Sequence, residues 1–179
     1  MACPPPTARL AFREMTHKDQ PPLERLLGDP AVMWVYTAPF DSAAVRAWID
    51  WNLGLYQERG FGLWLLTLRE TGEFVGECGL TIQNVEGTAE IEVGYQLLQE
   101  HWGRGLATEA AAACRDFARD VLGLDRLVAL IDPRNVASQH VASRIGLVLE
   151  RQARFPTKVL GVYAADLRTR RGTAADSPP

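Results

Sequence analysis

The chain has 179 residues, of which 47% are hydrophobic and 23% are charged. This length suits one domain with its own core, and the composition is that of an ordinary globular protein, which argues against a disordered or fibrous chain. With 19 basic and 22 acidic residues, the sequence lacks the basic surplus that nucleic-acid binding requires, so no nucleic-acid partner is expected.

The three cysteines, Cys3, Cys78 and Cys114, are widely spaced and form neither a C-x-x-C pair nor a ligand pattern with histidine. We expect free thiols and no metal site. No stretch approaches the roughly 20 apolar residues that span a bilayer, so a cytoplasmic protein with no membrane partner is expected. Residues 1–6 and 169–179 lack apolar periodicity and are expected to be flexible tails around a single domain at 7–168.

The first third of the chain is predicted to be helical after a short strand at 9–13. Leu23, Leu26 and Leu27 indicate a helix that ends at 28–30, because a proline disfavours helical geometry in the residue before it. From residue 42 to about 58 the apolar positions recur mostly at three- or four-residue steps. This pattern predicts a second helix, with Asp41 or Ser42 as its N-cap.

The middle of the chain changes to the period of strands. Runs at 61–68, 74–82 and 89–97 are separated by turn-forming residues at 70–73 and 86–87, which predicts an antiparallel meander. In the third run the odd-numbered residues form an apolar face. The opposite face carries Glu90 and Glu92 and is therefore unusually acidic.

A helix at about 105–122 follows, and a continuous apolar run at 127–131 indicates a buried strand parallel to the third meander strand. Asn135 can cap a further helix that ends at Gly146, and two last strands are expected at 147–149 and 159–167. The pattern predicts an α/β (α+β) fold with one mixed sheet and helices on both sides. The inner stripe of the helix at 105–122 is predicted to consist of Leu106, Ala110, Ala113, Cys114, Phe117 and Val121.

The loop at 99–109, with the sequence QEHWGRGLATE, joins the third meander strand to the following helix. Gly103 and Gly105 let the backbone approach a ligand, and the unpaired amides at the helix start favour an anion. A P-loop would need lysine and a hydroxyl where Leu106 and Ala107 stand, and a dinucleotide fingerprint would need glycine at Thr108. An acyl-CoA pyrophosphate loop is the remaining interpretation.

The segment EVGYQLLQEHWGRGLATEA resembles the cofactor motif of the GNAT N-acetyltransferase superfamily, and most closely that of its RimJ/RimL-like branch of ribosomal-protein N-terminal acetyltransferases. The resemblance extends from Leu10 through the downstream segment NVASQHVASRIGL to the final strand. Gln99 and Glu100 depart from the family pattern, but the loop binds mainly through backbone amides, so CoA binding is still expected. The resemblance implies the GNAT acyl-CoA N-acyltransferase fold, with a mixed, mostly antiparallel seven-stranded sheet.

The resemblance also implies acetyl-CoA as the co-substrate and no required metal. The strand ending near Leu97 would splay from its parallel neighbour, so that Leu97 and Leu98 contact the pantetheine arm. Asn135 and Ser138 match family positions close to the pantetheine and the sulfur. The residues expected to wrap the pyrophosphate are Trp102, Gly103, Arg104, Gly105, Leu106 and Ala107.

Glu92 matches a carboxylate that in many relatives acts as general base or orders the water that does, and Glu90 is the second choice. The alternative for Glu92 is a solvated strand carboxylate. The resemblance lets Ser138 protonate the departing thiolate, whereas by default it would be a capping hydroxyl, and Tyr163 can serve instead. These assignments make Glu92, Ser138 and Tyr163 the candidate catalytic residues.

The aromatic side chains of the first third either line an acceptor pocket or belong to the core. Trp34 and Tyr36 are the candidate acceptor-binding residues, with Trp48 and Trp51 beside them in the sequence. His101 and His140 do not have the spacing of a metal pair and are expected at the surface or in a loop.

The sequence thus predicts an N-acetyltransferase that transfers acetyl from acetyl-CoA to a primary amine by direct attack. The acceptor is left open between a protein N-terminus, an amino acid, a polyamine and an antibiotic, and the protein is expected to be a monomer or a homodimer. A non-catalytic CoA-binding or regulatory domain is the first alternative. A nicotinamide-dinucleotide-binding oxidoreductase is the second, with Asp132 as the only candidate for its ribose.

Overall fold

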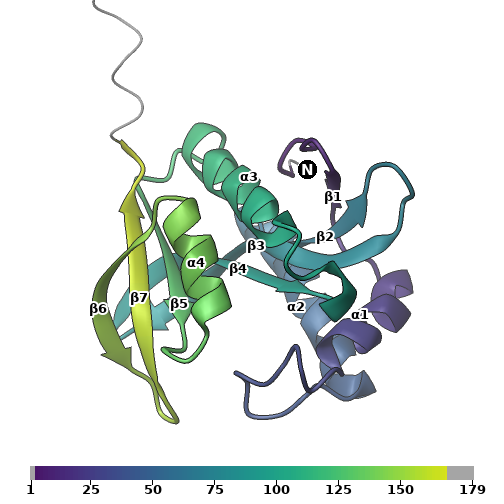
Figure 1. The fold of residues 1–179 in the computed structure, drawn as a ribbon, viewed down its shortest axis with the longest axis horizontal. Coiled ribbons are helices and arrows are strands. Elements are labelled where there is room, and N and C mark those ends of the chain that lie inside the picture. The colour runs from purple at the N-terminus through teal and green to yellow at the C-terminus, as the bar shows by residue number, and fades with distance from the viewer. Residues whose placement is uncertain (1–2, 169–179) are drawn as a thin grey trace, which may run out of the picture.

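The computed structural model describes residues 3–168, so residues 1–2 and 169–179, most of the two expected tails, lie outside the described part of the chain. One seven-stranded sheet runs in the order β1-β2-β3-β4-β5-β7-β6 (Figure 1). The strands are β1 (Leu10–Arg13), β2 (Leu63–Leu68), β3 (Phe74–Val85), β4 (Thr88–Leu97), β5 (Arg126–Ile131), β6 (Val148–Arg154) and β7 (Val159–Asp166). The helices are α1 (Gln20–Leu27), α2 (Ser42–Arg59), α3 (Leu106–Asp120) and α4 (Val136–Arg144), with 3-10 turns η1 (His17–Asp19) and η2 (Gln99–His101).

The sheet confirms the predicted mixed, mostly antiparallel topology. Strands β1 to β4 form an antiparallel meander, and the turn between β3 and β4 places Glu86 at φ 52° and Gly87 at φ 91°. Two consecutive positive φ angles match the hairpin turn that the right-handed twist of two paired strands prefers. The expected turn at 86–87 is therefore confirmed.

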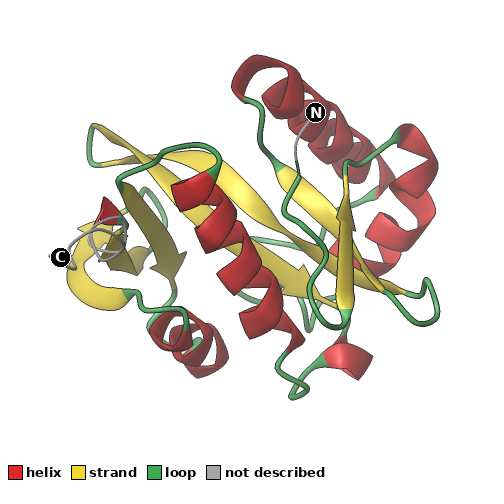
Figure 2. Ribbon diagram, turned by 90° about the horizontal axis from the view of Figure 1, so that it is seen from above, coloured by secondary structure: helices red, strands yellow, loops and turns green. Residues whose placement is uncertain are grey.

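Helices cover both faces of the sheet (Figure 2). Glu77 of β3 accepts a hydrogen bond from Trp48 of α2, and the next residue, Cys78, meets Cys114 of α3 at a sulfur-to-sulfur distance of 3.5 Å. Because successive side chains of a strand point to opposite faces, α2 and α3 must lie on opposite sides. Both thiols are buried and free, as the cysteine spacing predicted.

The two parallel strands of the sheet hardly pair. Strand β4 crosses over through α3 to the parallel strand β5, and the register between them holds one position, Glu92 opposite Val128. Strand β5 instead pairs along its whole length with β7. The sheet is thus two antiparallel halves that separate between β4 and β5.

Local signals at the helix starts explain the element boundaries. The Asp41 carboxylate accepts the Ala44 N–H at 2.8 Å, and the Asn135 side chain accepts the Ser138 N–H at 3.1 Å. The sequence predicted Asn135 as a cap and left the other cap open between Asp41 and Ser42, and the structure shows Asp41. Both caps satisfy an N–H that has no partner within its helix. Within residues 3–168, every helix is too short or too polar to serve as a membrane span.

Two expectations near α3 and β6 were wrong. Val121 does not belong to the inner stripe, because α3 ends at Asp120 and the Val121 side chain is 58% exposed. Strand β6 runs from Val148 to Arg154, well beyond the predicted 147–149. Its polar residues hid the strand in the sequence, because an edge strand with one solvated face carries charged side chains such as Glu150.

Gly79 of β3 and Gly54 of α2 provide a matched test of the packing between β2 and β3. A Cβ atom at Gly79 would lie 2.0 Å from the Gly62 carbonyl oxygen, whereas one at Gly54 meets nothing within 4 Å. We expect Gly79→Ala to lower the free energy of unfolding by at least about 2 kcal/mol. Gly54→Ala should raise it by about 0.5–1 kcal/mol, because alanine favours the helix. Urea unfolding followed by circular dichroism measures both, and equal effects would contradict the close approach at Gly79.

Candidate active site

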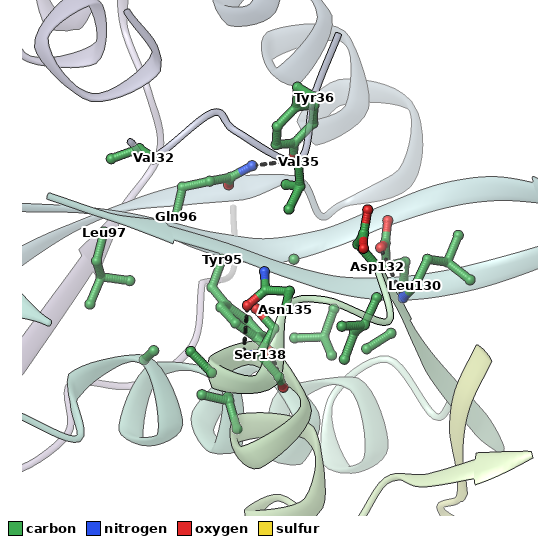
Figure 3. Close-up of a pocket in the computed structure, with 18 of the residues that line it drawn as sticks. Val32, Val35, Tyr36, Tyr95, Gln96, Leu97, Leu130, Asp132, Asn135 and Ser138 are labelled. Carbon is green, nitrogen blue, oxygen red and sulfur yellow. Dashed lines mark hydrogen bonds between the residues drawn. The ribbon is translucent and has the colours of Figure 1, made fainter. Parts of the chain in front are cut away.

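A cavity of about 970 Å³ opens where β4 and β5 separate, and most of the predicted site residues lie on its wall. Figure 3 shows that residues from both sides of the sheet reach it, with Tyr36 and Gln96 on one side of β4 and Leu97, Asn135 and Ser138 on the other. The predicted residues that line the cavity are Trp34, Tyr36, Glu92, Leu97, Trp102, Gly103, Gly105, Leu106, Ala107, Asn135 and Ser138.

Three predicted residues are not brought to the cavity wall. Leu98 is buried, and its N–H donates to the Val75 carbonyl at 3.0 Å. Arg104 is exposed and contacts the His101 ring at 3.1 Å. Tyr163 lies on β7 opposite Ala129, and the structure does not place it among the residues that line the cavity.

Glu92 occupies the separation between the strands. Its Oε1 accepts the backbone N–H of Leu130 at 3.2 Å, an amide of β5 beyond the single paired position. Its Oε2 accepts the Thr81 hydroxyl at 3.2 Å, and Gln83 donates to the same hydroxyl oxygen at 3.2 Å. The carboxylate therefore holds open the gap that a regular parallel ladder would close.

The electrostatic setting of Glu92 suits a proton acceptor. Burial raises its pKa from the ordinary value to about 7, although the Leu130 N–H, the Thr81 and Gln83 side chains and the nearby Lys158 oppose the shift. Desolvation disfavours the charged carboxylate, and hydrogen bonds and positive charge favour it. A base with a pKa near the working pH combines availability with proton affinity. The solvated-carboxylate alternative does not describe this residue.

Glu90, the second-choice base, has a different setting. Its carboxylate pairs with Arg126 at 3.0 Å, and the same guanidinium binds Glu150 at 2.8 Å on β6. Glu90 is not among the residues that line the cavity. Its contacts make it part of a bridge between β4, β5 and β6.

The start of α4 faces the cavity from the other side of the sheet (Figure 3). The Ser138 N–H donates to Asn135, and the Ser138 carbonyl accepts the Tyr95 hydroxyl at 3.0 Å. The backbone of Ser138, not its hydroxyl, therefore makes the capping contact. Within residues 3–168 the Ser138 hydroxyl has no protein partner, which leaves it available to a ligand in the cavity.

The glycine loop has the geometry that a phosphate site requires. Gly103 and Gly105 have φ angles of 70° and 75°, and the first loop amide bonded back into α3 is that of Glu109, to the Gly105 carbonyl at 3.1 Å. The preceding amides and the positive end of α3 can therefore face an anion. His101, expected at the surface or in a loop, lies in the turn η2 and is only 2% exposed, and its Nε2 lies 3.5 Å from Glu73.

A segment from the start of the domain holds this loop in place. The Glu109 carboxylate accepts the Thr7 hydroxyl at 2.6 Å, the Arg9 backbone N–H at 2.8 Å and the Arg9 side chain at 2.6 Å. Arg9 also donates to the Arg104 carbonyl inside the loop at 2.8 Å. Although burial opposes the shift, these hydrogen bonds and the Arg9 charge lower the pKa of Glu109 and keep it ionised.

Comparisons with known proteins agree with this geometry. Residues 9–148 match the family described as Acetyltransferase (GNAT) domain. The chain belongs to the GNAT acetyltransferase family. This GNAT protein is 39% identical over 158 residues to the uncharacterized protein YkkB of Bacillus subtilis, covering 88% of this chain and 92% of YkkB.

Solved structures share the GNAT fold. The acetyltransferase of Agrobacterium tumefaciens superimposes with a TM-score of 0.77 at 33% identity, covering 89% of this chain and 91% of that one. The ribosomal L7/L12 α-N-protein acetyltransferase RimL, solved with coenzyme A, has a TM-score of 0.72 at 20% identity over 91% of this chain and 97% of its own. At that identity the RimL likeness concerns the fold. The chain is a GNAT-family N-acetyltransferase.

Several residues of the site were missed from the sequence. Thr81 was read only as part of a strand, because its contact with Glu92 depends on the register between β3 and β4. Tyr95 was placed on the apolar face, and its hydroxyl contact with α4 is tertiary. The link between Arg9 and Glu109 joins residues 100 positions apart, so no local pattern signals it.

The glycines of the loop can be tested by substitution. We expect Gly103→Val and Gly105→Val to abolish detectable CoA binding, because a branched side chain strongly resists the positive φ angles that set the direction of the loop amides. Both positions are at the surface, so the variants should remain folded. Calorimetric titration with CoA measures the effect, and wild-type affinity in both variants would show that the loop does not bind the pyrophosphate.

The link between Arg9 and Glu109 predicts a non-additive pair of mutations. A carboxylate in the first turn of α3 repels a bound diphosphate, and Arg9 neutralises it, so Arg9→Gln should weaken CoA binding about tenfold. Adding Glu109→Gln should recover part of that loss, because the repulsive charge is then removed.

S-acetylpantetheine lacks the pyrophosphate and should be used equally well by wild type and Arg9→Gln. Arg151→Gln, which breaks the remote pair with Glu86, is the matched control and should bind CoA normally. Additive losses in the Arg9 and Glu109 variants would contradict charge neutralisation as the role of Arg9.

Proposed function

We propose that this GNAT protein acetylates a primary amine by direct attack of the amine on acetyl-CoA, with Glu92 as general base. The observation that carries the proposal is the position of Glu92, in the gap between β4 and β5, with a pKa raised to about 7. An amine acceptor is mostly protonated at neutral pH, so it must lose a proton before it can attack. A carboxylate in this gap can be reached from the α2 side and from the α4 side of the cavity.

Bound acetyl-CoA supplies the acetyl thioester. Glu92, directly or through a water, takes the proton of the ammonium group, and the amine nitrogen forms the bond to the acetyl carbon as the carbon–sulfur bond breaks. A backbone amide near Leu97 polarises the thioester carbonyl. The Ser138 hydroxyl, which lines the cavity without a protein partner, donates a proton to the departing thiolate and regains one from the second proton that the nitrogen releases as the amide forms. Tyr163 is the weaker candidate, because it is not part of the cavity wall.

The roles of the cofactor-binding residues follow from their places on the wall. Leu97 and Asn135 contact the pantetheine arm, and the loop from Trp102 to Ala107 receives the pyrophosphate. Leu98 and Arg104 lie outside the wall. Leu98 supports the end of β4 by packing, and the charge of Arg104 attracts the pyrophosphate. The structurally similar RimL was solved with coenzyme A, which supports a CoA-binding role for a protein of this fold.

The finer assignments rest on the resemblance to the RimJ/RimL-like branch. A cytoplasmic location is proposed separately, from the free cysteines. The assignments that rest on the resemblance are the branch itself and a protein N-terminus as one class of acceptor. The likeness in fold to RimL, an α-N-protein acetyltransferase, supports them. The monomer or homodimer prediction stays open to a measurement of mass in solution.

The two alternatives are less well supported. A non-catalytic CoA-binding domain has no need for a half-buried carboxylate with a raised pKa on the cavity wall, as Glu92 is. A dinucleotide oxidoreductase needs a free acidic residue for the ribose, and the Asp132 carboxylate is already held by Arg134 at 2.8 Å.

Substitution of Glu92 by glutamine tests the proposed base. At neutral pH we expect kcat/KM to fall about 10²–10⁴-fold in Glu92→Gln, with CoA affinity unchanged. In the wild type kcat/KM should rise as Glu92 loses its proton near pH 7, and this limb should be missing from the variant. The loss should shrink at high pH, where the acceptor deprotonates unaided.

Glu90→Gln is the matched control, since that carboxylate is held by Arg126 outside the cavity wall. Its pH profile should keep the limb near pH 7. A Glu92→Gln profile with the same limb as wild type would remove Glu92 from the role of general base.

A further inference from the structure

The exposed aromatic side chains of this protein gather at one place. Among residues 3–168, the aromatic side chains with the highest exposure are Trp34 at 45%, Tyr36 at 38%, Trp51 at 38% and Trp102 at 48%, and all four line the cavity. Trp102 belongs to the cofactor loop. The other three come from α2 and the segment before it, on the opposite side of the sheet from α3. Aromatic surface concentrated in a cleft is a mark of a ligand site.

The aromatic wall is fixed in place before any ligand arrives. The rings of Trp48 and Trp51 lie 5.0 Å apart, and Phe40 packs edge-on against Trp48 at 5.6 Å. The Trp48 indole N–H donates to both carboxyl oxygens of Glu77 at 3.1 and 3.2 Å. Glu77 is fully buried behind Trp48, so it orients the indole and is out of reach of a ligand.

Of the charged side chains described at this end of the cavity, Asp132, Arg134 and Lys158 contact other protein groups, whereas Glu92 accepts hydrogen bonds but forms no ion pair. Arg134 binds Asp132 and lies over the Trp34 ring at 5.4 Å. Lys158 donates to the Val35 carbonyl at 3.0 Å and lies over the Tyr36 ring at 5.5 Å. An acceptor carboxylate would therefore compete with existing contacts for a cation. A second ammonium group would find the Asp132 carboxylate taken.

The distances along β4 set the size of the acceptor. Glu92 and Gln96 both face the α2 side of the sheet, and four residues of strand separate them by about 13 Å. Between them lies Gly94, which leaves the floor without a side chain, and Leu63 covers that floor from β2. An amine at Glu92 would leave room for a small body, no longer than about 13 Å, against the aromatic wall.

We propose that the acceptor is a small primary amine with one positive charge, carried on an uncharged aromatic body. The amine lies at Glu92 and the body lies against Trp51, Trp34 and Tyr36. The inference rests on the proposed function and narrows its substrate class. It excludes protein N-termini, polyamines, amino acids and polyhydroxylated aminoglycosides as preferred acceptors.

A matched set of amines tests the substrate class with the full chain and acetyl-CoA. Tryptamine and phenethylamine present the predicted body, tryptophan adds a carboxylate to tryptamine, cadaverine and spermidine add ammonium groups, kanamycin presents a polyhydroxylated body, and a short peptide presents a free N-terminus. Release of free CoA thiol gives the rates, and mass spectrometry identifies the acetylated amine. We expect kcat/KM for tryptamine or phenethylamine to exceed that for every other amine in the set at least tenfold.

Preference for spermidine, kanamycin, tryptophan or the peptide would overturn the proposed class while leaving N-acetylation of an amine intact. Thiol release without an acetylated amine in any reaction would instead overturn the proposed function. The two failures are therefore distinguishable.

Trp51→Ala provides a second readout, because this side chain is exposed and its loss should not unfold the domain. We expect KM for tryptamine to rise about tenfold with kcat little changed, while KM for ethylamine, which cannot reach Trp51, stays the same. CoA affinity measured by calorimetry should equal that of wild type. Equal changes for both amines would contradict contact between the acceptor body and Trp51.

Discussion

The incomplete pairing of β4 with β5 is the constraint on which the rest of the structure depends. The strands are parallel neighbours, yet they meet at Glu92 and Val128 and then separate. A buried amide freed by such a separation needs a new partner, and Leu130 finds it in the Glu92 carboxylate. One side chain thus satisfies the exposed backbone of β5, keeps the gap open and places a proton acceptor inside it.

The gap matters because it joins two chemically different halves of one cavity. On the α3 and α4 side lie backbone amides, two glycines with positive φ angles and the start of a helix, which suit an anion. On the α2 side lie aromatic rings and a single available carboxylate, which suit an amine. Because a strand alternates its side chains between faces, β4 contributes Leu97 to one half and Glu92 to the other. The reacting groups can meet only through the gap.

Most of the fold was predictable from local patterns, because strand and helix periods, caps and turn residues are short-range signals. Asn135, for example, was identified as a cap and caps α4. Side-chain environments were less predictable. Glu90 and Glu92 share one face of one strand, but only tertiary pairing decides that Arg126 occupies the first and that the second reaches the gap. The predicted length of β6 was too short, because an edge strand carries polar residues that do not look like a strand. Val121 was wrongly placed on the inner stripe of α3, because it is an apolar residue that lies beyond the end of the helix.

A crystal structure of the full chain with CoA bound is the most direct test of the central claim, that the gap between β4 and β5 is where the two substrates meet. The account predicts the pyrophosphate at Gly103 and Gly105, the pantetheine arm along Leu97, and the sulfur on the α4 side of the gap with Glu92 facing it. CoA bound elsewhere, or β4 and β5 paired in a continuous parallel ladder in the complex, would contradict it.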